Sequence, residues 1–159
     1  MVSTDHAARI NKVVVGVDGS PSSLAALRWA YDQAVAHDAK LHAVMAWTQG
    51  PATVSAGMPR VPDLAPEETA RRVLDEAVAE VVGKGRDDLV ERFVVPGSPT
   101  KVLLDRAGDA DLLVVGSRGI GGFAGLLLGS VSQQVTQHAR CPVVVIRPPE
   151  SSDSGALTG

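Results

Sequence analysis

The sequence predicts an α/β fold, a doubly wound sheet of parallel strands with helices on both faces. Short apolar runs rich in β-branched residues alternate with segments of helical period, in the order β-α-β-α-β-α-β-α-β. Only 3% of the residues are aromatic, so the core must be built from Val, Leu, Ile and Ala, which suits a buried parallel sheet. The length of 159 residues favours one domain.

The first strand is expected at residues 12–17 (KVVVGV), an apolar run that is typical of a strand buried on both faces. Ser20 after it is a good helix N-cap, and Pro21 suits the first helical position. Apolar residues then recur at helical spacing until about His37. Residues 41–47 (LHAVMAW) predict the second strand.

The middle of the chain adds a long loop, two helices and a strand. Residues 48–65 contain three prolines and no periodicity, and a loop of this length is either functional or disordered. Pro66 opens a helix of clear apolar period that the glycines from Gly83 onward stop. Residues 89–95 predict the third strand, and Ser98 with the proline after it repeats the helix-start signal.

The C-terminal part predicts a fourth strand at residues 112–115, a glycine-rich loop at 116–128, a short helix at 129–139 and a fifth strand at 142–147. The expected organisation has three parts: an N-terminal extension (1–11), a single domain (12–147) and a flexible tail (148–159).

Composition and charge narrow the class of protein. The net charge of −3 argues against a nucleic-acid partner, because no large basic excess is present to neutralise phosphates. The single cysteine allows no intrachain disulfide and suits a reducing cytosol. No apolar run approaches the roughly 18 residues of a membrane span, and residues 1–11 lack the apolar core of a signal peptide. We therefore expect a soluble, cytoplasmic protein with no membrane partner.

The glycine-rich loop at residues 116–128 is the main candidate for a binding site, since it joins a buried strand to the start of a helix. Glycines let the backbone approach a ligand closely. The free N–H groups and the positive dipole at a helix N-terminus attract phosphate. Ser130 and Ser132 can add hydroxyl donors. The alternative is a flexible connection that binds nothing.

Three standard motifs do not account for this loop. A P-loop needs a Gly-Lys-Ser/Thr ending, which is absent. A dinucleotide fingerprint can be read from Gly119 to Ala124, but it follows the fourth strand and no acidic residue comes about twenty positions later. A nucleophile elbow is absent because Gly116 directly precedes Ser117.

The spacing Gly116-x2-Gly119-x9-Gly129-Ser130 resembles the ATP-binding motif of the universal stress protein family. The segments VVVGVDGSPSS, DLLVVGSRGIGG, LLLGSVSQQV and CPVVVIRP also resemble that family, and the resemblance covers residues 12–147. It implies the ATP-binding branch of the family and a Rossmann-like sheet of five strands in the order 3-2-1-4-5. Asp18 and Gly116 would then converge between the first and fourth strands, where such folds bind ligands.

The resemblance also implies roles for individual residues. Asp18 would hold the ribose or the metal of a Mg²⁺-nucleotide, and the backbone of Ala46 would read the adenine. Gly116 and Gly119 would lie along the ribose and the α-phosphate. A cradle for the β- and γ-phosphates would consist of three residues: Gly129, Ser130 and Val131. Ser132, in the same helical turn, completes the predicted nucleotide-binding set.

Little in the sequence supports efficient catalysis. It contains no Walker lysine, no recognisable arginine finger and no pair of carboxylates that stands out as catalytic. The leading hypothesis is an ATP-binding stress or signalling protein that is not an enzyme, acting through a protein partner that the sequence does not identify. The alternatives are binding of AMP or cyclic AMP, slow ATP hydrolysis or nucleotidyl transfer with Asp18 as the acting group, and an interaction module with an empty site.

The remaining candidate residues receive structural interpretations. The histidines are expected at the surface or at edges, because none is spaced from another like a metal ligand: His6, His37, His42 and His138. Cys141 is interpreted as a small buried residue. Val143–Ile146 would be an apolar edge strand, which invites pairing with a second copy, and the resemblance also implies a homodimer.

Overall fold

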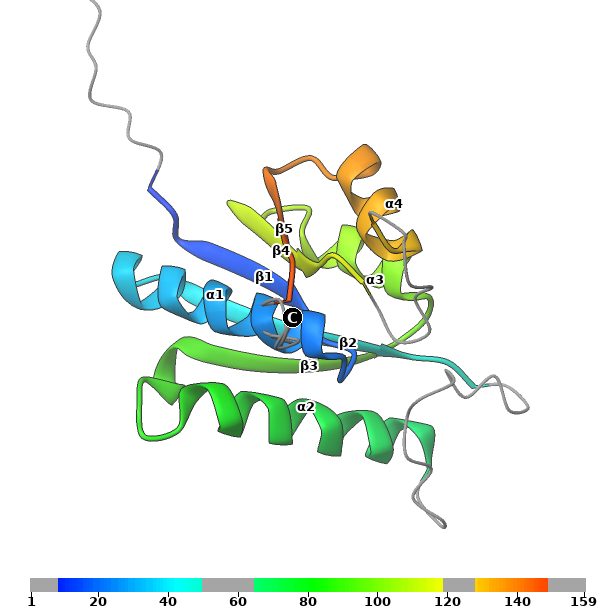
Figure 1. The fold of residues 1–159 in the computed structure, drawn as a ribbon, viewed down its shortest axis with the longest axis horizontal. Coiled ribbons are helices and arrows are strands. Elements are labelled where there is room, and N and C mark those ends of the chain that lie inside the picture. Colours follow the sequence, from blue (N-terminus) through cyan, green and yellow to red (C-terminus); the bar gives the residue numbers. More distant parts are fainter. Residues whose placement is uncertain (1–8, 50–64, 119–127, 149–159) are drawn as a thin grey trace, which may run out of the picture.

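The computed structural model describes residues 9–49, 65–118 and 128–148, and these form one parallel five-stranded sheet covered by helices on both faces (Figure 1). The strand order is β3-β2-β1-β4-β5, which confirms the order implied by the family resemblance. The strands are β1 (Lys12–Gly16), β2 (Lys40–Trp47), β3 (Val90–Pro96), β4 (Leu112–Gly116) and β5 (Val143–Ile146).

The helices are α1 (Pro21–His37), α2 (Pro66–Val82), α3 (Pro99–Arg106) and α4 (Ser130–His138), with a short 3-10 turn, η1 (Asp87–Leu89), before β3. The Ser-Pro signals act as expected. The Ser20 hydroxyl accepts a hydrogen bond from the Ser23 N–H at 3.1 Å, and the Ser98 hydroxyl accepts one from the Lys101 N–H at 3.4 Å. Asp38 ends α1 in the left-handed conformation, with φ of 51°.

Strand side chains alternate between two apolar cores, as a period of two requires. Val13 and Val15 of β1 pack under α1 and α2, whereas Val14 packs under α3 and α4. All three valines are fully buried. Figure 1 shows the same division, with α1 and α2 on one side of the sheet and α3 and α4 on the other. Right-handed crossovers produce this arrangement when the strand order reverses after β3.

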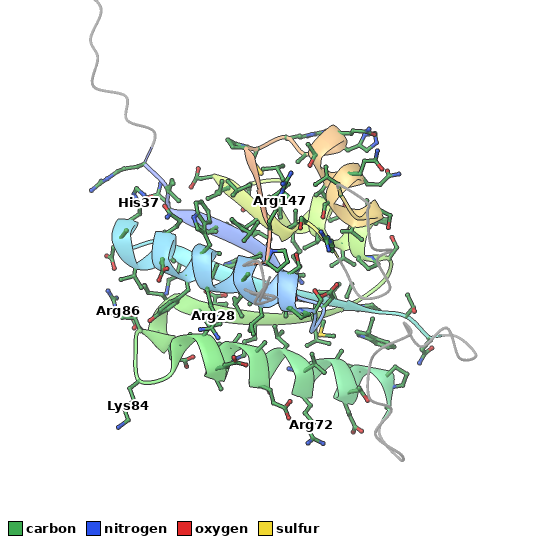
Figure 2. The ribbon with its side chains drawn as sticks, viewed as in Figure 1. Arg28, His37, Arg72, Lys84, Arg86 and Arg147 are labelled. Atoms are coloured by element: carbon green, nitrogen blue, oxygen red, sulfur yellow. The ribbon has the colours of Figure 1, made fainter. Side chains whose placement is uncertain are left out.

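Ion pairs lie on the exposed faces of α1 and α2. Arg28 of α1 meets Glu80 of α2 at 2.8 Å, which joins the two helices that cover one face. Figure 2 shows Arg72 and Lys84 pointing away from the body of the domain. The solvent face of α2 carries five exposed carboxylates: Glu67, Glu68, Asp75, Glu76 and Glu80.

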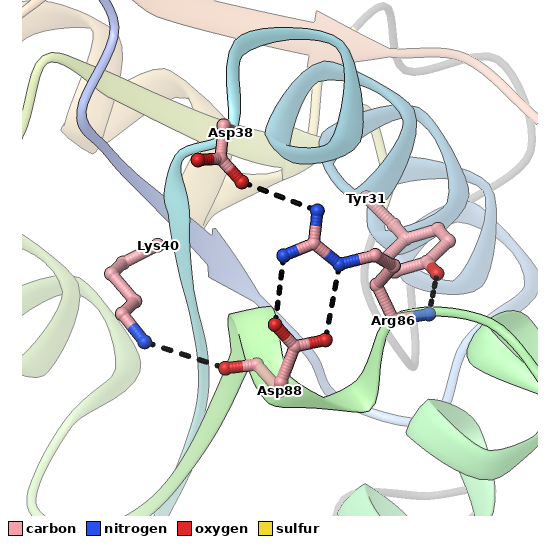
Figure 3. Close-up of polar contacts among 5 residues, drawn as sticks. All are labelled: Tyr31, Asp38, Lys40, Arg86 and Asp88. Atoms are coloured by element: carbon pink, nitrogen blue, oxygen red, sulfur yellow. Dashed lines mark hydrogen bonds and ion pairs between the residues drawn. The ribbon is translucent and has the colours of Figure 1, made fainter.

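A polar network closes the sheet at the end where β2 and β3 begin (Figure 3). The Arg86 guanidinium contacts Asp38 at 3.2 Å and Asp88 at 2.8 Å, and it holds the pKa of Asp88 below its ordinary value. The Arg86 N–H donates to the Tyr31 hydroxyl at 2.6 Å, and Lys40 donates to the Asp88 carbonyl at 3.3 Å. The network ties the end of α1 to the turn before β3, at the edge opposite the strand carboxyl ends.

One histidine does not lie where the sequence suggested. His42 is on β2, an interior strand, and its side chain is only 16% exposed. Its ring packs against Phe93 of β3 in a tilted arrangement, with the centroids 4.8 Å apart. The prediction of a surface or edge position is wrong for His42 because its parity along β2 directs it to the side of the sheet that carries α3. His37 and His138 are exposed, as expected.

Several predicted features fall outside the described residues: most of the 48–65 loop, Gly119 with the central part of the glycine-rich loop, most of the N-terminal extension and nearly all of the C-terminal tail. Within the parts that the structure describes, no helix combines the length and hydropathy needed to cross a membrane.

Candidate functional site

The buried polar side chains of the described residues are all serines, and they gather at one end of the sheet: Ser20, Ser22, Ser23, Ser117 and Ser132. Three come from the start of α1, one follows β4 and one lies in the first turn of α4. Buried hydroxyls need hydrogen-bond partners. Their partners here are mostly backbone groups of the segments that follow β1 and β4, where a doubly wound fold binds its ligand.

The turn after β1 is organised around Asp18. Its carboxylate accepts the Ser20 N–H at 2.9 Å, and its own N–H donates to the Ser23 hydroxyl at 3.2 Å. Gly19 between them has φ of 83°, a conformation that favours glycine. Asp18 is therefore a turn-forming residue. Its nucleotide role stays a prediction, and the turn places it at the expected end of β1.

The turn after β1 lies against the segment after β4. The Ser20 hydroxyl contacts the Arg118 carbonyl at 3.5 Å, and the Ser22 hydroxyl accepts the Arg118 N–H at 3.2 Å. The predicted convergence of the Asp18 turn with the end of β4 at Gly116 is thus present in the structure. Arg118 itself is exposed.

Gly116 ends β4 and is needed for space. A Cβ at this position would lie 2.7 Å from the carbonyl carbon and the hydroxyl of Ser22, so no side chain fits. Its φ is not positive, so glycine is required here for space and not for backbone conformation. The Gly116 carbonyl accepts a hydrogen bond from the Ser132 hydroxyl. That bond directs the Ser132 hydroxyl to the backbone, and a contact of Ser132 with nucleotide stays a prediction.

The two ends of the glycine-rich loop are held together. The Gly129 N–H donates to the Ser117 carbonyl at 2.6 Å, and the Ser117 N–H donates to the Ile146 carbonyl of β5 at 2.8 Å. The segment that leaves β4 and the residue that begins α4 are therefore neighbours. The predicted residues Gly116 and Gly129 therefore lie close together.

The start of α4 differs from the starts of α1 and α3. Gly129 is its N-cap and, having no side chain, makes no capping hydrogen bond to the first turn. Ser130 is exposed, and Val131 is half-buried against the core under α3 and α4. Unpaired N–H groups in a first helical turn and the helix dipole favour an anion. The glycine N-cap therefore supplies no side-chain acceptor to these N–H groups, and their contact with a phosphate stays a prediction.

Ala46 lies near the carboxyl end of β2. It is half-buried, packs on the core under α3 and α4, and pairs in register with Val95 of β3. The Val17 N–H, just past β1, donates to the Val44 carbonyl at 2.9 Å, and Ala46 follows two residues further along. Its backbone thus lies toward the same edge as Asp18. Contact with an adenine stays a prediction.

The serines at the start of α1 are the part of this cluster that the sequence analysis did not identify. Ser20 was assigned only a capping role, and Ser22 and Ser23 received none. The available signal was the run of hydroxyl residues, Ser-Pro-Ser-Ser, in a helix start directly after a buried strand. A first turn at such a place packs against neighbouring loops, and its small polar side chains can reach their backbone groups.

The described residues give little support for a metal site or a cysteine nucleophile. In residues 9–49, 65–118 and 128–148, no group of three or more His, Cys, Asp or Glu side chains could hold a metal ion. Cys141 is half-buried, and burial raises the pKa of its thiol, which disfavours the thiolate that a nucleophile requires. Among the described residues, the start of α4 with its glycine N-cap is therefore the main candidate for ligand binding.

Comparison with known proteins gives a consistent family. A sequence model of the universal stress protein family matches residues 9–147. A universal stress protein of Mycolicibacterium smegmatis is 40% identical over 141 residues, which are 86% of this chain and 45% of that protein. Another, from Mycobacterium tuberculosis, is 41% identical over 135 residues, 85% of this chain and 44% of that protein. The chain thus spans less than half the length of these relatives.

One of the similar solved structures contains a bound ligand. The crystal structure of a universal stress protein in complex with cyclic AMP matches with a TM-score of 0.61 and 34% sequence identity, covering 89% of this chain and 99% of that one. The fold and the sequence therefore agree on the same group of proteins.

Proposed function

This chain belongs to the universal stress protein family, and from that premise we propose that it binds an adenine nucleotide, ATP in the first place, where β1 and β4 end. The site would consist of the residues predicted from the sequence: Asp18, Ala46, Gly116, Gly119, Gly129, Ser130, Val131 and Ser132. Binding would change how the protein engages a partner, so its role would be that of a nucleotide-responsive stress or signalling protein.

The open N-terminus of α4 is the observation that carries the proposal. Gly129 provides no side-chain cap, whereas Ser20 and Ser98 cap α1 and α3 through their hydroxyls. The uncapped turn is held against the end of β4 by the bond from Gly129 to the Ser117 carbonyl. Backbone N–H groups in this position can bind phosphate oxygens without a lysine.

Asp18 fits a supporting role with Mg²⁺ or ribose. One carboxylate oxygen accepts the Ser20 N–H at 2.9 Å, which fixes the orientation of the group. A carboxylate is the oxygen ligand that Mg²⁺ prefers, and Mg²⁺ is commonly held by one or two carboxylates together with the phosphates of the substrate. Mg²⁺ bound in this way would neutralise phosphate charge.

Efficient turnover is not part of the proposal. Fast phosphoryl transfer needs a residue that activates or orients the nucleophile and cations that stabilise the transferred group. The described residues at this end of the sheet are mainly serines and glycines, with Asp18 engaged in its turn. We therefore place the protein among nucleotide-binding proteins and not among enzymes.

Cyclic AMP is the second candidate ligand, because the solved relative that is 34% identical was crystallised with it. It shares the adenine and ribose of ATP and carries a single phosphate. An AMP-like ligand would use the Gly116 side of the site and leave the start of α4 less occupied. ATP is favoured because the glycine spacing continues to Gly129 and Ser130.

A homodimer through β5 is also proposed. β5 lies at the edge of the sheet, and its four residues are apolar and only half-buried. An edge strand of this kind presents unpaired backbone groups to a second strand. A cytoplasmic location completes the proposal and is supported by the single cysteine, which needs no oxidising compartment.

The nucleotide that accompanies the purified protein tests the proposal directly. The protein is denatured, and the released small molecules are separated by liquid chromatography with mass detection. Ligand-free protein is then titrated calorimetrically with Mg²⁺-ATP, AMP and cyclic AMP. Preferred binding of ATP supports the main proposal, and preferred binding of cyclic AMP supports the second candidate. Absence of binding by all three would refute both.

A further inference from the structure

We propose that Ser22 is a positioning residue of the nucleotide site: its hydroxyl fixes the peptide group between Ser117 and Arg118 and thereby the start of α4. This inference rests on the proposed function. Ser22 is not predicted to touch the nucleotide. It is 3% exposed, in the first turn of α1, behind the chain segment that leaves β4.

The Ser22 hydroxyl is not required for helix capping. The Ser20 hydroxyl caps α1 by accepting the Ser23 N–H at 3.1 Å, and the Ser23 hydroxyl bonds back to the Ser20 carbonyl at 3.0 Å. Ser22 instead points across to distant segments. It accepts the Arg118 N–H at 3.2 Å and lies 3.4 Å from the Ile146 carbonyl. Its bonds therefore join α1 to the ends of β4 and β5.

One peptide group is held at both of its ends. The N–H of Arg118 donates to Ser22, and the carbonyl of Ser117, in the same peptide, accepts the Gly129 N–H at 2.6 Å. The described peptide bonds are all trans, so this N–H and carbonyl point in opposite directions. The planar peptide group thus connects α1 to Gly129, the N-cap of α4. A rotation of its plane would break both hydrogen bonds.

The Ser22 hydroxyl should affect the part of the proposed site that would bind the β- and γ-phosphates. Gly129 caps α4, and the bond to Ser117 sets where the free N–H groups of that helix lie. Without the Ser22 hydroxyl, the Ser117–Arg118 peptide loses one of its two anchors, and the position of Gly129 is less well defined. A ligand with β- and γ-phosphates should lose affinity, whereas a ligand that lacks them should lose little.

The test compares Ser22→Ala with the native chain. The dissociation constants of Mg²⁺-ATP and AMP are measured by titration followed by NMR, and exchange of the Arg118 amide hydrogen is measured without ligand. We expect the ATP dissociation constant to rise about tenfold, the size of one lost buried hydrogen bond, and the AMP value to change less than about twofold. The Arg118 amide should exchange faster.

Ser98→Ala is the matched control, since it removes a hydroxyl that caps a different helix, α3, by accepting the Lys101 N–H. It should change neither the ATP-to-AMP affinity ratio nor the Arg118 exchange rate. An equal loss of ATP and AMP affinity in Ser22→Ala would show a general scaffold role and overturn the inference, as would an unchanged Arg118 exchange rate. If the native chain binds no nucleotide, the proposed function fails instead, and the inference falls with it.

Discussion

Ser22 occupies the space that a side chain on Gly116 would need: a Cβ built on Gly116 lies 2.7 Å from the Ser22 carbonyl carbon and 2.8 Å from its carbonyl oxygen. The last residue of β4 is therefore in direct contact with the backbone of α1. This packing explains why a glycine stands at the end of β4, apart from any ligand. Gly116 therefore has a packing role that does not depend on its predicted role beside the nucleotide.

Gly116→Ala should destabilise the fold. The added methyl group meets backbone atoms that cannot move without shifting α1, and such overpacking costs about 1–3 kcal/mol. The free energy of unfolding in urea, measured without nucleotide, checks this. Gly16→Ala is the comparison, because the nearest atoms to its methyl group would be the end of the Leu103 side chain, at 2.9 Å, rather than backbone. Equal losses in the two variants would contradict the argument.

Gly129→Asp should separate stability from nucleotide binding. Gly129 has extended backbone angles (φ of −70°, ψ of 166°) that an aspartate N-cap adopts, so its carboxylate would cap α4 and interact favourably with the helix dipole. The unfolding free energy should stay equal or rise by a few tenths of a kcal/mol, about the difference between Gly and Asp caps. The ATP affinity should fall at least about tenfold, because the carboxylate takes the place of phosphate.

The control for Gly129→Asp is Ser98→Asp, which places the same carboxylate at the cap of α3. It should leave the ATP affinity unchanged. Calorimetric titration with Mg²⁺-ATP measures both variants. If Gly129→Asp binds ATP as tightly as the native chain, phosphate does not lie at the start of α4.

The positions of most elements could be predicted from local sequence. Ser-Pro pairs at residues 20–21 and 98–99 mark the starts of α1 and α3 because hydroxyl caps and a fixed proline φ are local effects. The predicted strands agree with the observed ones to within about one or two residues, the usual uncertainty of element ends. The strand order followed from the family resemblance, since local pattern does not specify which strands pair.

The role of Ser22 could not be predicted in this way. Its hydroxyl bonds to a residue 96 positions away, and no local period reports such a contact. The interior position of His42 was missed for a related reason. The run LHAVMAW is apolar around the histidine, but only the known faces of the sheet show that His42 and Phe93 project to the same side. The glycine loop was found because its signal is a spacing within one segment.

Acid should weaken the fold through His42. Its Nδ1 is buried without a hydrogen-bond partner among the described residues, and its pKa is lowered by burial and by the nearby Lys12. The other charged groups that act on it are Glu91, Asp109 and Arg106. A lowered pKa means that the folded state favours the neutral ring. The stabilisation is complete above the unfolded pKa of about 6.5 and is lost as the pH falls toward the lower folded value.

Urea unfolding at pH 7.5 and pH 5.5 measures this contribution. The native chain should lose more stability between the two pH values than His42→Leu, whose side chain does not titrate. All other groups contribute similarly to both proteins, so the difference isolates His42. An identical pH dependence in the two proteins would falsify the assignment.

Val145→Pro should weaken the proposed dimer. The Pro142 carbonyl accepts the N–H of Leu113 in β4, and the Ile146 carbonyl accepts the N–H of Ser117 just after β4. Alternate residues of β5 therefore face β4, and the backbone of Val145 faces the open edge. Proline removes the edge-facing N–H and is tolerated on edge strands. Sedimentation velocity at micromolar concentration should show the native chain as a dimer and this variant as a monomer. Val145→Thr keeps both the N–H and the β-branched shape, so it should remain dimeric. If the native chain sediments as a monomer, the proposed dimer is wrong. The proposed nucleotide binding is tested separately, by the calorimetric titration.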